Sequence, residues 1–589
     1  MEKRGSGSLR PRQRSTRRVT FLTLVLLALA APAGFVLAGE RSSPYIVLFD
    51  EDTVSTIVAG QATGPLRATA TDTSNGATTR QEVDPARVSK HVAEIQARSR
   101  LKVTNVYTRA VGGFSTELTR AQVRTLERDP AVAAIVEDEE IHLDEVSAGF
   151  GAGGIRTTAN PRASIPAGIR RVGAQRNTLA RVDGRDTRVS ADVAIIDTGI
   201  ERNHPDLNVV GGYNCTSRNR DNWDDVDGHG THVAGIVGAL DNRIGVVGVA
   251  PGARLWSVKV LGPRGSGRLS WLVCGVDWVT SQRERGNPSR PLFEVANMSI
   301  SFGGSGAAGS KCGKGSNDWL HQAICRSVAR GTVYVVAAGN ESHNARRNRP
   351  AAYDEVITVS AMADYDGKGG GRGVSSDSCP YWSRERDDSF TSFSNYGADV
   401  DLIAPGKCVL STYLRKRYAW MSGTSMAAPH IAGAAAVYRA MYPRATPGQV
   451  RMALLAVGTR DWRTTTDPDR VPEKAVWIGS FRTMPDYTTS AAAAAVGVPA
   501  GGKVRVTLTV NRVGGFEDPV SIGLVGPPAG ISAATVTTSG ASTTVELSAA
   551  GGVALGRYLI VLRSVSGDVE RTNVVWVLVR GPLVEQAGR

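Results

Sequence analysis

Residues 193–199 read VAIIDTG, a run of four apolar residues that stops at an aspartate, a threonine and a glycine. A short apolar run bounded by a turn signal is typical of a strand buried on both faces. Three more such runs follow at Leu255–Val260, Val295–Ile300 and Val333–Ala338, with helical patterns between them. The alternation predicts an α/β domain, in which a parallel sheet is covered by helices on both faces. Asp197 would then lie at the carboxyl edge of the sheet, where such folds build their sites.

A histidine follows about thirty residues later, in residues 227–235, which read DGHGTHVAG. Glycines flank His229 just before a helix-forming run, so that its side chain can face a cleft. Two other interpretations stay open at this point. An aspartic protease would need a second D-[ST]-G motif, and this block contains none. His229 and His232 could be metal ligands on one helical face, but no third ligand stands out nearby.

A serine stands far downstream, in residues 423–430, which read GTSMAAPH and lead into the small-residue helix Ile431–Tyr442. The glycine and the small neighbours let a substrate backbone approach Ser425, and the start of a helix favours developing negative charge. Taken alone, a serine before a helix is usually only its N-cap.

The order Asp, His, Ser and the wording of the three motifs resemble the subtilisin-like serine proteases, over roughly residues 170–463. The resemblance implies that Asp197, His229 and Ser425 form a catalytic triad. It also implies that Asn340, which follows the buried run 333–338, helps to hold the oxyanion. The segment Ser301, Phe302 and Gly303 matches the part of the family that pairs with the substrate backbone.

The resemblance extends to a calcium-binding loop at residues 240–248, which read LDNRIGVVG. Calcium prefers hard oxygen ligands. The implied ligands are Asp206, Leu240, Asn242, Ile244 and Val246, the aliphatic ones through their backbone oxygens. The family's ligand from the mature N-terminus is not identifiable here, and a surface loop without metal is the alternative.

A small α+β unit precedes this block. Its pattern predicts strands at 45–49, 101–107, 113–118 and 131–136, and helices near 89–99 and at 120–126. Residues 44–143 resemble the inhibitory propeptides of the family, although an independent binding domain is the alternative. Residues 144–166 form a Gly- and Pro-rich linker open to cleavage, and the catalytic domain is expected at 167–463.

The chain changes character after a linker expected at residues 464–484. Residues 485–581 carry β-branched alternation separated by glycine-rich turns, which predicts an antiparallel β-sandwich. This unit resembles the immunoglobulin-like modules appended to bacterial secreted proteases. Its role is open between substrate adhesion and stability.

The N-terminus predicts export. Basic residues precede the apolar run Val19–Ala31 and small residues follow it, as in a signal peptide, which we place at residues 1–38. The run is short for a membrane anchor, so no stable membrane insertion is expected. Much of the formal charge of +14 lies in this segment, so nucleic acid is not an expected partner. The protein is expected to be secreted and extracellular.

Six cysteines lie in the central block, and an even number in an exported protein suggests disulfides. Their connectivity cannot be deduced from the sequence. A preference for short loops favours Cys215 with Cys274, Cys312 with Cys325, and Cys379 with Cys408. A zinc site is the rival interpretation, but no pair is spaced C-x-x-C.

These observations predict a secreted serine endopeptidase that is made as a self-cleaving precursor. Its expected partners are protein or peptide substrates and its own propeptide, and it is expected to be a monomer. Two alternatives remain: a protease dedicated to one precursor, and a binding protein that uses an inactive protease scaffold.

Overall fold

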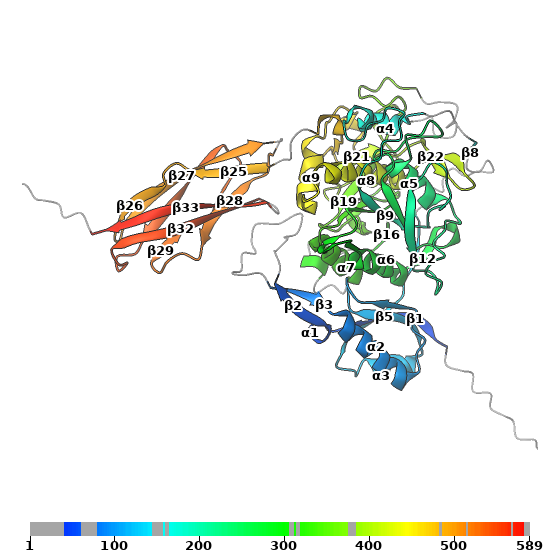
Figure 1. Cartoon of the computed structure of the whole chain (residues 1–589), viewed down its shortest axis with the longest axis horizontal. Helices are drawn as coiled ribbons and strands as arrows, with labels where there is room; N and C mark the ends of the chain where they lie inside the picture. The colour runs from blue at the N-terminus through cyan, green and yellow to red at the C-terminus, as the bar shows by residue number, and fades with distance from the viewer. Residues whose placement is uncertain are drawn as a thin grey trace, which may run out of the picture. The chain divides into compact units, whose positions relative to one another are not determined.

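The computed structural model describes residues 41–59, 79–143, 157–159, 164–304, 311–313, 318–374, 385–481, 486–513, 516–566 and 569–581. The expected signal peptide and most of the expected linker at 144–166 lie outside these residues. Within them, the backbone forms a small N-terminal unit, a central α/β unit and a C-terminal β unit, shown as ribbons in Figure 1.

The central unit is built on a parallel sheet with the strand order β10-β11-β9-β15-β17-β19-β21-β24, and β20 pairs antiparallel with β19. The strands are β9 (Asp192–Asp197), β10 (Val209–Asn214), β11 (Arg254–Lys259), β15 (Val295–Met298), β17 (Val333–Ala337), β19 (Ile357–Ala363), β20 (Ser389–Phe390), β21 (Leu402–Pro405) and β24 (Lys474–Ala475). The four strands predicted from apolar runs are therefore confirmed as β9, β11, β15 and β17.

Side chains alternate across the sheet into two separate cores. Val193 and Ile195 of β9 belong to the core that contains α5 and α8, whereas Ala194 and Ile196 belong to the core that contains α6 and α7. The helices of this unit are α4 (Ala167–Arg171), α5 (His229–Gly238), α6 (Leu269–Ser281), α7 (Trp319–Ala329), α8 (Thr424–Met441) and α9 (Pro447–Ala456). The predicted fold class, a parallel sheet with helices on both faces, is confirmed (Figure 1).

Short strands complete the rim of the central unit. They are β8 (Thr157–Thr158), β12 (Ser266–Arg268), β13 (Arg283–Glu284), β14 (Asn287–Pro291), β16 (Phe302–Gly303), β18 (Asn348–Arg349), β22 (Val409–Tyr413) and β23 (Arg417–Met421). The segment expected as a linker, 464–484, contains β24, which joins the central sheet beside β21. Ile478 lies in the same core as α8, so this segment contributes to the central unit.

The N-terminal unit is a four-stranded antiparallel sheet with the order β4-β5-β1-β6. Its elements are β1 (Ser43–Phe49), α1 (Glu51–Val54), β2 (Ser55–Ala59), β3 (Thr79–Val83), α2 (Pro85–Ser99), β4 (Asn105–Tyr107), β5 (Gly113–Leu118), α3 (Arg120–Leu126), β6 (Val132–Glu137) and β7 (Glu140–His142). The strand predicted at 101–107 is shorter than expected. It begins at Asn105, and Leu101, which precedes it, is buried in the core of this unit.

The C-terminal unit has two sheets, ordered β25-β27-β31-β29 and β26-β33-β32-β28-β30, around one core. Its strands are β25 (Asp486–Ala491), β26 (Ala495–Pro499), β27 (Lys503–Val513), β28 (Val520–Val525), β29 (Ile531–Ala533), β30 (Val536–Thr538), β31 (Ser542–Ala549), β32 (Gly556–Ser566) and β33 (Val569–Arg580). One pair departs from the expected antiparallel pattern, because β26 and β33 run parallel.

Two of the expected disulfides are confirmed, Cys215 with Cys274 and Cys312 with Cys325. Cys408 is also disulfide-bonded, and its expected partner, Cys379, lies outside the described residues. In the described part of the chain, no helix combines the length and the apolar character that a membrane crossing requires.

Candidate active site

Asp197 and His229 meet where the end of β9 faces the start of α5. The Nδ1 atom of His229 lies 2.8 Å from Oδ1 of Asp197, and both side chains are almost completely buried. Glycine is needed beside them, because a Cβ on Gly230 would lie 2.1 Å from the carbonyl oxygen of Gly199. Gly230 therefore lets α5 approach the end of β9 closely enough for this hydrogen bond.

Ser425 lies in the first turn of α8, with 9% of its surface exposed. Its hydroxyl donates a hydrogen bond to the carbonyl oxygen of Ser299, at 3.1 Å, and the hydroxyl of Ser299 donates to the carbonyl oxygen of Ser425, at 2.8 Å. The structure records no hydrogen bond between the described side chains of Ser425 and His229. Of the two contacts expected, the one between the Asp197 carboxylate and the His229 imidazole is formed. A contact between Ser425 and His229 requires the serine hydroxyl to rotate away from Ser299. Catalytic hydrogen bonds are often incomplete in proteins without substrate.

Asn340 follows β17, and its side chain points at the start of α8. Its Oδ1 atom accepts hydrogen bonds from the backbone N–H and the hydroxyl of Thr424, each at 2.9 Å. This fixes the orientation of the amide, so that its NH2 group faces the other way. A Cβ on Gly423 would lie 3.6 Å from Nδ2 of Asn340 and 3.7 Å from the backbone nitrogen of Ser425. Two N–H donors therefore border one small space beside Gly423, which suits a negatively charged oxygen.

The electrostatics of the site favour a protonated imidazole. Burial opposes the charged form of His229, but the carboxylate of Asp197, with those of Asp227 and Asp225 behind it, outweighs burial and raises the pKa of His229 to about 9. A histidine in this environment takes up a proton readily and holds it as an ion pair. The imidazole can receive a proton from a neighbouring hydroxyl in its neutral form, which prevails above this pKa, and Asp197 then stabilises the imidazolium that results.

The segment expected to bind substrate follows the carboxyl end of β15 in the same sheet. Phe302 and Gly303 form β16, which pairs antiparallel with β18. The hydroxyl of Ser301 accepts a hydrogen bond from the side-chain amide of Asn348, at 2.9 Å, and the guanidinium of Arg349 lies 4.8 Å from the ring centre of Phe302. Gly303 is exposed, with open space where a side chain would be.

The edge of β12, which the motifs did not reveal, is paired with a strand of the N-terminal unit. Strand β12 pairs antiparallel with β7 of the N-terminal unit, with Gly267 opposite Ile141. The pairing continues to Leu143, whose N–H donates to the carbonyl oxygen of Gly265, at 2.9 Å. The glycine-serine-glycine sequence at residues 265–267, where β12 begins, was the available signal for such an edge. The N-terminal unit thus pairs an extended strand with β12, in the segment that follows β11.

Acidic side chains hold the N-terminal unit against α6. Asp138 accepts hydrogen bonds from the backbone N–H of Ser270, at 2.8 Å, and from its hydroxyl, at 2.6 Å, at the start of that helix. Asp277 of α6 accepts hydrogen bonds from the backbone N–H groups of Thr108, Arg109 and Ala110. These contacts link residues distant in the sequence, and no local motif announces them.

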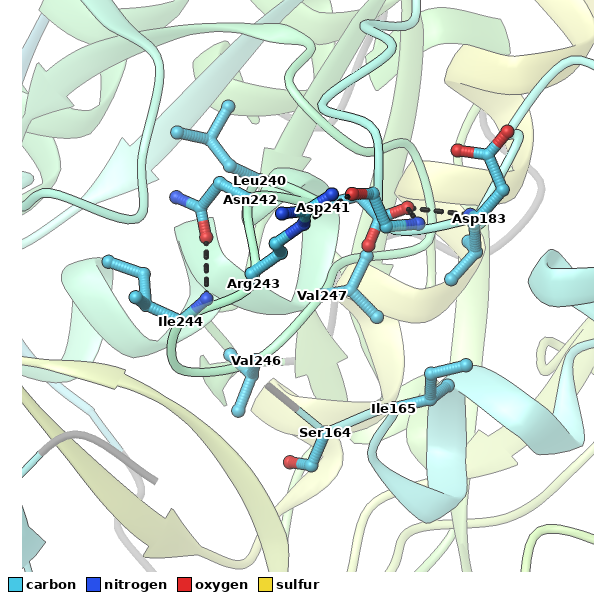
Figure 2. A pocket seen from close by; sticks show the side chains of 12 residues that line it. Ser164, Ile165, Asp183, Leu240, Asp241, Asn242, Arg243, Ile244, Val246 and Val247 are labelled. Atoms are coloured by element: carbon cyan, nitrogen blue, oxygen red, sulfur yellow. Dashed lines mark hydrogen bonds between the residues drawn. The ribbon is translucent and has the colours of Figure 1, made fainter. Parts of the chain in front are cut away.

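Four of the five residues expected to bind calcium lie around one loop, shown in Figure 2. Leu240, Asn242, Ile244 and Val246 line a pocket of about 250 Å³. Asp206 is not part of this lining but contacts the same loop, because its Oδ2 atom accepts a hydrogen bond from the N–H of Val246, at 3.0 Å.

The donor set around this loop fits a cation. The Oδ1 atom of Asp206 is buried without a hydrogen-bond partner, and burial raises the pKa of this carboxyl to about 7. Oδ1 of Asn242 accepts a hydrogen bond from the N–H of Ile244, as the dashed line in Figure 2 shows. A buried carboxylate oxygen without a partner, next to a loop of backbone carbonyls, is an arrangement that a hard cation such as calcium satisfies.

A second acidic cluster was not expected. Asp364, Asp366 and Asp387 bring carboxylate oxygens within 4.8 Å of one another. The cluster already faces a buried cation, since Nε of Arg171 lies 3.0 Å from Oδ2 of Asp364. Cys312 and Cys325 also lie near Glu355, but these cysteines are joined in a disulfide.

Comparison with known proteins assigns families to two parts of the chain. The subtilase family model matches residues 190–469, and the peptidase inhibitor I9 model matches residues 44–144. The chain is 38% identical over 299 residues to subtilisin DY of Bacillus licheniformis, which covers 50% of this chain and 92% of that protein. It is 33% identical over 352 residues to subtilisin NAT of Bacillus subtilis subsp. natto, covering 59% of this chain and 76% of that protein.

Among solved structures, the chain is similar to a cold adapted subtilisin-like serine proteinase, with 29% identity and a TM-score of 0.40, over 55% of this chain and 100% of that one. The relatives matched in sequence are covered over most of their length, and the matched region contains all three motifs. The chain therefore belongs to the subtilase family, as a serine endopeptidase that carries an inhibitor I9 domain ahead of its catalytic unit.

Proposed function

We propose that this protein is a secreted endopeptidase that hydrolyses peptide bonds through an acyl-enzyme, with Asp197, His229 and Ser425 as its triad. The observation that carries the proposal is the buried 2.8 Å hydrogen bond between His229 and Asp197. It lies at the same sheet edge as the start of α8, where Ser425 stands beside the amide of Asn340.

Each residue has one role in this mechanism. The hydroxyl of Ser425 attacks the scissile carbonyl carbon while Nε2 of His229 takes its proton and later gives it to the leaving amine. Asp197 orients the imidazole and stabilises the imidazolium. The amide of Asn340 and the backbone N–H of Ser425 hold the oxyanion. Water then hydrolyses the acyl-enzyme by the same proton transfers in reverse.

The substrate backbone binds as an added strand. The pairing of β7 with β12 supports this, because an extended segment of the chain already uses that edge. Ser301, Phe302 and Gly303 provide the second binding segment. Recognition through main-chain hydrogen bonds accepts many sequences, which suits an enzyme of broad protein specificity.

The precursor contains a segment that inhibits the enzyme until it is cleaved. Residues 1–38 are a signal peptide, 44–143 an inhibitory propeptide, and 144–166 a linker that the enzyme cleaves itself. The catalytic unit includes β8, which pairs with β23, and extends through the segment 464–481, because β24 belongs to its sheet. Residues 485–581 form an immunoglobulin-like module. The mature enzyme acts as a monomer on extracellular proteins.

Calcium is the structural cofactor in this proposal. Asp206 and Asn242 would hold it through side-chain oxygens, and Leu240, Ile244 and Val246 through backbone oxygens. The ion would neutralise a buried carboxylate and tie the loop to the central unit. It takes no part in the reaction at Ser425.

The test is covalent labelling of the processed protein with a fluorophosphonate, followed by peptide mapping. The proposal requires the label on Ser425 and its loss in Asp197→Asn and in His229→Ala. Ser425→Ala should also keep the propeptide attached. If Ser425→Ala matures normally with no other protease present, self-cleavage by this site is wrong, whereas absence of label in the wild type rejects the triad itself.

A further inference from the structure

Asp225 lies in the loop before α5 and is one of the most heavily bonded carboxylates near the site. It is 6% exposed. Its Oδ1 atom accepts hydrogen bonds from the hydroxyl of Thr198, at 3.0 Å, and from the backbone N–H groups of Asp227 and Gly228, at 2.9 and 3.0 Å. Its Oδ2 atom accepts from the N–H and the hydroxyl of Thr231, at 3.0 and 2.6 Å.

These hydrogen bonds connect the end of β9, which carries the Asp197 carboxylate, with the start of α5, which carries the His229 imidazole. Thr198 directly follows Asp197, while Gly228 directly precedes His229. The hydroxyl of Thr198 also accepts a hydrogen bond from the N–H of Gly230, at 2.9 Å. Gly228 provides no side-chain cap for α5, so the carboxylate of Asp225 satisfies N–H groups that the start of the helix leaves open.

A lysine approaches the same carboxylates from β11. Lys259 is paired in register with Asp197 and is 6% exposed. Its ammonium group donates a hydrogen bond to the carbonyl oxygen of Thr198. Burial lowers the pKa of Lys259, and the neighbouring carboxylates, led by that of Asp225, act against this. A buried ammonium needs such compensation to stay charged.

Charged and titratable groups approach the imidazole from several elements of the central unit. Asp197 faces it from β9, and Asp224, Asp225 and Asp227 belong to the loop before α5. Lys259 faces the same carboxylates from β11, and His232 is the neighbouring imidazole on α5 itself. Arg202, from the loop after β9, lies with its Nε atom 3.8 Å from Oδ1 of Asp224. Lys259 is the buried cation among these charges, so it offsets part of the negative charge that favours the imidazolium.

We infer that Asp225 and Lys259 are positioning residues of the reaction: Asp225 fixes the geometry of Asp197 and His229, and Lys259 sets how much negative charge the imidazole experiences. Neither residue forms a hydrogen bond with Asp197 or His229 in the described structure, so both act through Thr198 and the backbone around His229. This inference rests on the proposed triad.

The two residues have opposite electrostatic effects. During acylation His229 takes the proton of Ser425 and becomes positive, which the carboxylate of Asp225 stabilises and the ammonium of Lys259 opposes. Asp225→Asn should therefore lower the pKa of the imidazole, and Lys259→Met should raise it. Asp225→Asn should also loosen the geometry, since an asparagine NH2 group would face N–H donors.

The experiment uses the mature enzyme with Asp225→Asn, Lys259→Met and, as a matched control, Asp221→Asn, an exposed aspartate of the same loop. Active sites are counted by fluorophosphonate labelling, and kcat and KM for a chromogenic peptide are measured from about pH 5 to about pH 10. Asp225→Asn should lower kcat by about 10- to 100-fold with KM nearly unchanged. The acid limb of kcat should fall by about one pH unit in Asp225→Asn and rise in Lys259→Met.

The outcomes separate this inference from the proposed function. The inference is wrong if Asp225→Asn keeps the wild-type kcat per labelled site and the acid limb does not move. It is also wrong if Asp225→Asn loses only thermal stability. If Asp225→Asn does not mature, Lys259→Met decides, because an unmoved acid limb in that variant also overturns the inference. A wild-type enzyme that does not label rejects the triad itself, whereas normal wild-type labelling with unaffected variants rejects only the roles of Asp225 and Lys259.

Discussion

The carboxylate of Asp277 accepts a hydrogen bond from the backbone N–H of Ala110 at 2.6 Å, although the two residues are 167 positions apart in the sequence. The same side chain accepts from the N–H groups of Thr108 and Arg109, at 2.9 and 2.7 Å. One buried carboxylate of the catalytic unit thus binds three successive main-chain donors of the inhibitor domain. Because backbone groups supply the donors, the contact depends on the shape of this turn rather than on its side chains.

Asp277→Ala should weaken inhibition by the propeptide. Hydrogen bonds to a charged group contribute about 1.5–3 kcal/mol, which corresponds to about a 10- to 100-fold higher inhibition constant. The measurement is peptide hydrolysis by processed but unseparated precursor over a dilution series. Asp221→Asn, an exposed aspartate of the same unit, is the control. Equal inhibition of both variants would show that the contact contributes nothing to binding.

Asn340→Leu should lower kcat and leave KM nearly unchanged. The amide is held by Thr424 so that its NH2 group borders the space beside Gly423 and the N–H of Ser425. In subtilisin, loss of the corresponding donor costs about 10²–10³ in kcat. Steady-state kinetics with sites counted by fluorophosphonate give the comparison. A rise in KM with unchanged kcat would mean that Asn340 binds the ground state rather than the oxyanion.

The sequence predicted the parts of the fold that depend on local pattern. β9 and β17 are short apolar runs that stop at an aspartate and before a glycine, respectively, and both were placed to within two residues. The helix start at His229 also follows from local signals, because glycines and a following apolar run surround it. The motifs predicted that Asp197 and His229 would lie at one sheet edge, and the structure brings their side chains within hydrogen-bond distance.

What the sequence could not predict depends on contacts between distant segments. The hydrogen bonds of Asp225 become visible only when β9 and α5 lie side by side, and no motif contains Lys259. The antiparallel pairing of β7 with β12 joins two units whose patterns are unrelated. The rotamer of Ser425, turned towards Ser299, is a choice among staggered states that no sequence pattern encodes.

Calcium should stabilise the mature enzyme through Asp206. Removing calcium with a chelator should lower the melting temperature of the wild type, since a ligand at 100 times its Kd contributes about 2.7 kcal/mol. Asp206→Asn should remove most of this response. Asp366→Asn tests the second acidic cluster and should leave the response intact. If Asp366→Asn removes the calcium response and Asp206→Asn retains it, the ion binds at the other cluster.

Glu473→Gln should stabilise the protein at alkaline pH. Glu473 is 8% exposed, and its Oε2 atom has no hydrogen-bond partner in the described chain. Burial, together with the carboxylates of Asp467, Asp469 and Asp401, raises its pKa from 4.5 to about 8. The folded protein therefore keeps a proton that the unfolded chain releases.

The sign of the effect follows from this difference. Below pH 4.5 Glu473 is protonated in both the folded and the unfolded protein, so it does not destabilise the fold. Between pH 4.5 and about 8 the free energy of unfolding falls as pH rises, because only the unfolded chain releases the proton. Above pH 8 the destabilisation by Glu473 is complete. Glu473→Gln removes the titration, so its gain should be near zero at about pH 4 and reach roughly 1–4 kcal/mol at about pH 9. Thermal unfolding of fluorophosphonate-inactivated enzyme avoids self-digestion, and exposed Glu517→Gln is the control. A gain that is equal at all pH values would show that packing, rather than the buried charge, sets the cost of Glu473.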